Sequence, residues 1–130
     1  LGALGGPAYF AGTLEFQSQD IGFNHLAEAR VNMPSSEIGR DGWLRSLLGT
    51  NTCFRADVLR AVGGFDEQFD YFLDESELCF RIQQRGWLVG YAPELYLRHE
   101  FAQSSNRSGG FKFNWYAICK NTAYFIAAYG

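Results

Sequence analysis

The sequence has few cysteines, few prolines and no excess of basic residues, and two of these shortages exclude classes of protein. Only 3 of its 130 residues are cysteines, Cys53, Cys79 and Cys119. They are too far apart for a CxxC metal site and too few for a dense disulfide framework, so we expect a reduced, cytoplasmic setting. The 11 basic residues are outnumbered by 14 acidic ones, which excludes nucleic-acid binding through a basic surface.

Long apolar runs and targeting signals are missing as well. Lys120 and Asn121 interrupt the aromatic run near the end, and no stretch reaches the roughly 18 apolar residues of a membrane span. No basic segment followed by an apolar one opens the chain, so no signal peptide is predicted. The sequence begins at Leu1 without a methionine and stops after an apolar run, so we expect residues 1–130 to be part of a single domain, truncated at both ends.

The chain does contain enough apolar residues for a packed core. Hydrophobic residues make up 47% and aromatic residues 17% of the sequence, whereas 19% are charged, a balance typical of globular domains. Fifteen glycines indicate many tight turns. Together these features predict a mixed α/β fold.

Local patterns predict the order of the elements. The first ten residues are typical of a buried strand that enters a Gly-Pro turn, and residues 13–19 alternate like a half-exposed strand. Residues 20–41 show no period and are expected to form a long surface loop. The other expected elements are strands at 47–54, 87–91 and 94–98, and helices at 57–62, at 74–85 and from Phe111 onward.

The densest acidic cluster lies where a turn is expected to enter a helix. Asp74, Glu75 and Glu77 follow one another there. Acids at this position satisfy free N–H groups and the helix dipole, which is the purely structural interpretation. Alternatively, a carboxylate held among the aromatic residues of the turn would have a raised pKa and serve as a general base. Arg81 follows Glu77 by four positions and is expected to pair with it.

Motifs for several other chemistries are missing. The sequence contains no GxxxxGK[ST], GxGxxG, HExxH or GxSxG pattern, so phosphate-binding loops, dinucleotide sites, zinc proteases and nucleophile elbows are not supported. His99 follows a strand-like run, and a single histidine there is either a hydrogen-bonded structural group or a metal ligand.

Residues 49–99 resemble the C-terminal, acceptor-binding half of inverting glycosyltransferases of family 2, which have the GT-A fold. The motifs that carry this resemblance are Gly63-Gly64-Phe65-Asp66, Asp74-Glu75-Ser76-Glu77-Leu78, Arg81, Gly86-Trp87, Pro93 and His99. The resemblance implies a partial GT-A fold with a mixed sheet flanked by helices, from which the N-terminal nucleotide-binding half is missing. It therefore also implies that the isolated chain does not turn over.

The resemblance also implies roles for individual residues. Glu75 falls where the family places its catalytic base, with Asp74 as an acidic neighbour that is the alternative base, because the family more often has Asp at this position. His99 falls where many members place a ligand of Mg²⁺ or Mn²⁺. The chemistry of the remaining motif residues suggests acceptor binding, for which the candidates are Gly64, Phe65, Asp66 and Trp87.

The implied function is metal-assisted transfer of a sugar, with inversion, from a nucleotide-sugar donor to a saccharide or lipid-linked acceptor. We expect a bacterial enzyme of polysaccharide biosynthesis in the cytoplasm, at the inner face of the membrane, with peripheral association through regions outside this chain. An exposed sheet edge would favour self-association. The alternatives are a non-catalytic carbohydrate-binding or scaffold module and an α/β domain in which Glu75 faces bulk solvent and the acids only cap a helix.

Overall fold

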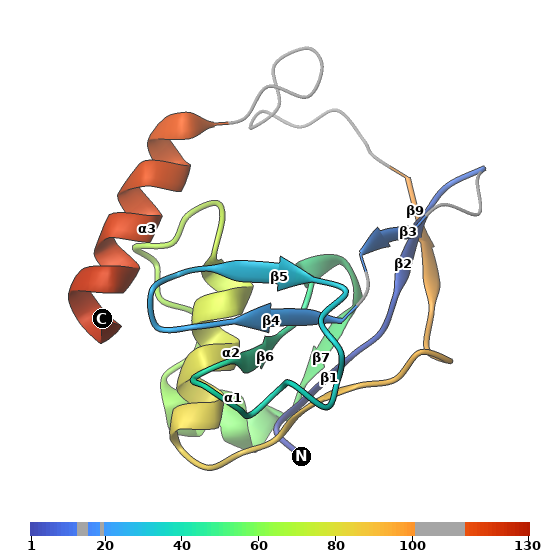
Figure 1. The fold of residues 1–130 in the computed structure, drawn as a ribbon, viewed down its shortest axis with the longest axis horizontal. Helices are drawn as coiled ribbons and strands as arrows, with labels where there is room; N and C mark the ends of the chain where they lie inside the picture. Colours follow the sequence, from blue (N-terminus) through green and yellow to red (C-terminus); the bar gives the residue numbers. More distant parts are fainter. Residues whose placement is uncertain (13–15, 19, 101–113) are drawn as a thin grey trace.

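The computed structural model describes residues 1–12, 16–18, 20–100 and 114–130 (Figure 1). Short strands and helices share this part of the chain, which confirms the predicted α/β class and is compatible with part of a Rossmann-like fold. The strands are β1 (Ala3–Gly5), β2 (Ala8–Phe10), β3 (Phe16–Ser18), β4 (Ile21–Phe23), β5 (Ala29–Val31), β6 (Leu44–Ser46), β7 (Thr52–Phe54), β8 (Val89–Tyr91) and β9 (Leu97–His99). The helices are the 3-10 helix η1 (Gly49–Asn51), α1 (Ala56–Val62), α2 (Asp74–Gln84) and α3 (Trp115–Tyr129).

The strands form three sheets, two of which are mixed, as predicted. β1 lies between antiparallel β7 and parallel β8, and β2 lies between antiparallel β3 and parallel β9. In the third sheet, β4 lies between β5 and β6 and is antiparallel to both. α2 packs on β6 and contacts α1 and β8, so it occupies the middle of the molecule, while α3 stands at one side (Figure 1).

The predicted Gly-Pro turn joins β1 to β2. Its Gly6 is required by close backbone approach, because a Cβ at this position would overlap the carbonyl oxygen of Leu95. The side chain of Asn51 fixes the same region by donating to the carbonyl oxygens of Pro7 and Leu95, at 3.0 and 2.7 Å. These bonds tie η1 to the connection between β8 and β9.

Two hydrophobic clusters form the core, and α2 contributes to both. One joins β1, β8 and α1 to the inner face of α2, where Leu78, Cys79 and Ile82 have no exposed surface. The other is mainly aromatic and brings Phe80 of α2 against α3, with Phe125 edge-on to its ring at a centroid distance of 5.2 Å. The second cluster thus docks α3 against the beginning and middle of α2.

The expectation of a loop over residues 20–41 is wrong in part, because β4 and β5 form a hairpin there. All three residues of β4 are buried and all three of β5 are exposed, so neither strand alternates and no period was visible. Asn24 closes the hairpin, since its Oδ1 accepts from the backbone N–H groups of Leu26 and Glu28. Residues 34–43 consist of turns, as expected.

Two further boundaries differ from the prediction. The expected strand at 47–54 is divided into η1 and β7, of which only the second pairs with β1. The last helix begins at Trp115, with Asn114 as its cap, and Phe111 lies outside the described residues. Its buried stripe is Ala117, Asn121 and Phe125, whereas Trp115 is exposed.

Candidate active site

The acidic segment begins with a strained turn. Phe72 and Leu73 have φ values of 77° and 69°, a left-handed conformation that is uncommon for any residue except glycine and costs of the order of 1 kcal/mol per residue. Leu73 is also the N-cap of α2, so the strain lies directly before Asp74 and Glu75. Two successive left-handed residues at this point turn the chain sharply from the second hydrophobic cluster into α2.

Glu75 is held at its carboxylate by the 3-10 helix η1. Its Oε1 accepts a hydrogen bond of 3.0 Å from the backbone N–H of Gly49. A Cβ at residue 49 would lie only 3.2 Å from this oxygen, so glycine allows the close approach. The side chain is therefore partly buried rather than turned to bulk solvent, which disfavours the interpretation in which the acids only cap a helix.

Burial and a neighbouring acid shift the proton affinity of Glu75. Desolvation is the larger cause and the interaction with Asp74 is the next, and together they raise the pKa of Glu75 from 4.5 to about 7. The protonated and ionised forms of Glu75 are therefore closer in free energy at neutral pH than those of an ordinary glutamate. A carboxylate in this state can accept a proton and release it again, as a general base requires.

Glu77, two residues later, has a structural role. It is fully buried, and both of its oxygens pair with Arg81, as predicted, while the hydroxyl of Tyr129 also donates to it. Arg81 in turn donates to the carbonyl oxygens of Val62 and Gly64. The sequence predicted the ion pair but not its burial or its connection to α1 and α3.

The Gly-Gly-Phe-Asp motif closes α1 and forms the turn beyond it. Gly63 and Gly64 have φ values of 88° and 76° and bond back to the last turn of α1, at Arg60 and Leu59 respectively. A Cβ at either glycine would meet no heavy atom within 4 Å, so glycine is required here by the backbone angle. This is the predicted helix stop.

The contacts of the other motif residues, those predicted to bind the acceptor, do not involve Glu75. Phe65 is half exposed and packs edge-on against Phe54, with a centroid distance of 5.8 Å. Asp66 accepts from the backbone N–H of Gln68 at 2.9 Å. Trp87 lies beyond the C-terminal end of α2, under the guanidinium of Arg55. The backbone N–H of Trp87 donates to the carbonyl oxygen of Ile82 in the last turns of α2, whereas Glu75 lies in the first turn.

His99 ends β9, as predicted, and pairs in register with Phe10 of β2. In the described part of the chain, no group of three His, Cys, Asp or Glu side chains is arranged to hold a metal ion. The described residues therefore do not form a metal site by themselves, and His99 supplies one candidate ligand.

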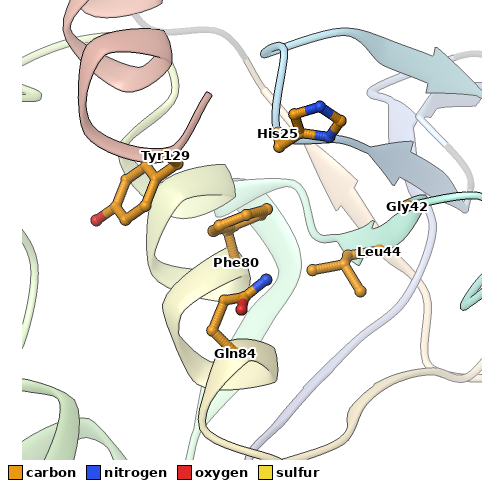
Figure 2. Close-up of a pocket in the computed structure, with 6 residues that line it drawn as sticks. All are labelled: His25, Gly42, Leu44, Phe80, Gln84 and Tyr129. Carbon is orange, nitrogen blue, oxygen red and sulfur yellow. The ribbon is translucent and has the colours of Figure 1, made fainter.

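A cavity of about 510 Å³ lies elsewhere, between the β4–β5 hairpin, β6 and the end of α3 (Figure 2). Phe80 and Gln84 of α2 face it, beneath His25. None of the sequence-predicted site residues lines it.

Among the described helices, none has both the length and the apolar character needed to cross a membrane.

Comparison with known proteins finds similarity to a glycosyltransferase. Over 66 residues, the chain is 33% identical to proteins of two Mycobacterium tuberculosis strains, CDC 1551 / Oshkosh and ATCC 25618 / H37Rv. Both are described as N-acetylglucosaminyl-diphospho-decaprenol L-rhamnosyltransferase. Half of this chain is thus similar to a glycosyltransferase. The match covers 51% of this chain and 20% of each relative, and no family model matches.

Two residues that build the site were missed in the sequence. Gly49 binds Glu75, and Asn121 of α3 donates to the carbonyl oxygens of Tyr71 and Phe72 in the strained turn. A signal for Asn121 was present, because an asparagine in the middle of an apolar helix needs partners. Nothing in the sequence marked Gly49, since its contact with Glu75 spans 26 positions.

Proposed function

We propose that this chain belongs to a GT-A enzyme of family 2 and supplies the general base, Glu75, for transfer of a sugar with inversion. The observation that carries the proposal is the state of Glu75, a partly buried carboxyl with a pKa of about 7 that is held in place by the Gly49 N–H. The similarity of half of the chain to a rhamnosyltransferase supports sugar transfer as the reaction class.

In the proposed step, the Glu75 carboxylate removes the proton of an acceptor hydroxyl. The hydroxyl oxygen forms a bond to the anomeric carbon of a nucleotide sugar, from the face opposite the leaving group. The bond between that carbon and the diphosphate oxygen breaks, and its electron pair leaves with the nucleoside diphosphate. The proton remains on Glu75 until solvent removes it, which a pKa near 7 allows.

Asp74 and Gly49 prepare Glu75 for this step. The negative charge of Asp74 disfavours ionisation of its neighbour and so strengthens it as a base. The Gly49 N–H occupies one lone pair of Oε1 and fixes the direction of the carboxylate. Asp74 remains the alternative base, and the experiment below separates the two.

On the acceptor side, we propose a saccharide or lipid-linked acceptor, since the relatives' name describes a sugar on diphospho-decaprenol. Gly64, Phe65 and Asp66 are the proposed contacts, because they lie together on the turn after α1, and the half-exposed ring of Phe65 offers an apolar face to a sugar. Trp87, at the far end of α2, would reach only a distant part of an acceptor.

A divalent ion, Mg²⁺ or Mn²⁺, would neutralise the departing diphosphate. His99 is the one ligand that we propose from this chain, and the described residues do not complete the site. No step above depends on the ion. The other ligands and the nucleotide-sugar site would come from regions outside this chain, so we expect the isolated 130 residues to be inactive.

The test is a transfer assay on the full-length protein, with a panel of nucleotide sugars and a diphospho-polyprenol-linked saccharide acceptor. We expect Glu75→Gln to lower the transfer rate by about 10²-fold or more, because the general base is lost. Glu67→Gln, which changes an exposed acid on the preceding turn, is the matched control and should leave the rate unchanged.

The outcomes separate the alternatives. Loss of activity in Asp74→Asn with full activity in Glu75→Gln would assign the base to Asp74. A protein that binds glycans but transfers no sugar from any donor would contradict the proposed function and favour a binding module. Chelation of divalent ions in the same assay tests the proposed metal requirement.

A further inference from the structure

α3 makes hydrogen bonds along its length to residues 66–77, the turn before α2 and the first turn of α2. Lys120 binds Asp70 and the carbonyl oxygen of Gln68, Tyr124 reaches Asp66, and Tyr129 reaches Glu77. Between these contacts lies Asn121, which is fully buried. Its Nδ2 donates to the carbonyl oxygens of Tyr71 and Phe72, at 2.7 and 2.6 Å. One amide thus holds both peptide groups that lead into the strained turn.

A buried asparagine at position 121 lowers the stability of the fold unless the hydrogen bonds from its Nδ2 compensate. Its Oδ1 is buried and has no hydrogen-bond partner among the described residues. An unsatisfied buried acceptor destabilises a fold by about 1–3 kcal/mol, and an apolar side chain on this face of α3 would avoid that penalty. The two bonds from Nδ2 offset it, and they act on Phe72 and Leu73, whose left-handed backbone needs external support.

We propose that Asn121 is a positioning residue for the reaction: by holding the carbonyl groups of Tyr71 and Phe72, it fixes the left-handed turn at the start of α2 and so directs the Glu75 carboxylate toward the Gly49 N–H. The role of Asn121 in the reaction rests on the proposed function. Its effect on the position of Glu75 does not, because that effect concerns the fold alone. Asn121 acts through the backbone of the turn, since its hydrogen bonds go to the carbonyl oxygens of Tyr71 and Phe72 and not to the Glu75 carboxylate.

The environment of Glu75 provides a readout that does not require activity. Its titratable neighbours are Asp74 and Cys79, both on α2, and from η1 it faces the uncharged N–H of Gly49. The hydrogen bonds of Asn121 go to the carbonyl oxygens of Tyr71 and Phe72 and to none of these groups. Release of the turn would let the carboxylate move toward water, which reduces the desolvation that raises its pKa. Loss of the bond from Gly49, which lowers the pKa, acts in the opposite direction, but desolvation is the largest cause and Gly49 the smallest, so the net change is a fall.

The experiment is a carboxyl-carbon NMR titration of Glu75 in the 130-residue chain, with Asn121→Asp as the first variant. Asp has the shape of Asn but no donors when it is ionised. We expect the pKa of Glu75 to fall by about one unit or more toward its usual value. Asn121→Ala gives the same test if the aspartate variant does not fold.

Two further variants separate positioning from general stability. Ala117→Gly lies one turn earlier on the same buried stripe and weakens α3 by about 1 kcal/mol, and it should leave the pKa of Glu75 unchanged. Phe72→Gly in the Asn121→Ala background should restore the pKa, because glycine adopts a positive φ without support.

An unchanged pKa in a folded Asn121 variant, or an equal shift in Ala117→Gly, would overturn the inference. The outcome is independent of the transfer assay. Loss of transfer in Glu75→Gln with no effect of Asn121 on the titration would leave the proposed function standing and remove the positioning role. A shifted titration in a protein without transfer activity would support the positioning of Glu75 by Asn121 and contradict the proposed function.

Discussion

The hydroxyl of Tyr129, in the last turn of α3, donates a hydrogen bond to Oε1 of Glu77, which lies 52 positions earlier. Burial and this bond to a carboxylate both raise the pKa of Tyr129, so the phenol stays protonated and keeps its donor. Glu77 has no exposed surface, and the bond satisfies part of a buried charge that water cannot reach.

From this relationship, we expect Tyr129→Phe to lower the free energy of unfolding by about 1.5–3 kcal/mol, the range for a hydrogen bond to a charged group. Urea unfolding of the 130-residue chain measures it. Tyr124→Phe is the matched control on the same helix, because its 3.4 Å bond to Asp66 is exposed and should contribute less than about 0.5 kcal/mol. Equal losses in the two variants would contradict a special role for the buried bond.

Glu75 predicts a distinct dependence of stability on pH. Its folded pKa of about 7 lies above its usual 4.5, so the folded state binds this proton more tightly than the unfolded state does. The contribution of Glu75 therefore becomes less favourable as pH rises from about 4.5 to 7 and is constant above that.

Glu75→Gln removes this dependence. The variant should match the parent near pH 4 and be more stable above pH 7, by roughly 3 kcal/mol for a shift of this size. Thermal or urea unfolding between pH 4 and 8 tests it, and Glu67→Gln should follow the parent at every pH. A glutamine variant that is less stable than the parent at pH 8 would show that the folded site favours the ionised carboxyl.

The three cysteines should differ in reactivity. Cys53 and Cys119 are exposed, whereas Cys79 is buried and its desolvation raises the pKa of the thiol to about 12. We expect two thiols to react with a disulfide reagent at pH 8 in the native chain, and the third only after unfolding. Cys79→Ala should abolish the slow phase alone, and a slow phase that persists would place the protected thiol elsewhere.

The parts of the fold that could be predicted are those specified by neighbouring residues. Gly63-Gly64 stops α1 and the acids before Leu78 start α2, because helix ends are satisfied by groups within a few positions. The pair of Glu77 and Arg81 is one helical turn apart and was predicted for the same reason.

The parts that could not be predicted depend on distant contacts. β4 and β5 show no alternation, since the first is buried on both faces and the second is exposed on both. Glu75 could be named from its motif, but the Gly49 N–H that holds its carboxylate lies 26 positions away, and the turn before it is held by Asn121, about 50 positions away. No local pattern encodes either contact.

The contacts of the Arg81 guanidinium couple the unfolding of the three α-helices. It binds two carbonyl groups at the end of α1, a carboxylate on its own helix and, through that carboxylate, a phenol on α3. Opening of α1 or α3 removes a hydrogen-bond partner from a desolvated charge on α2, and opening of α2 removes the charged partner of the carbonyl groups and of the phenol. The helices should therefore exchange their slowest amide protons at a common rate, as one cooperative unit.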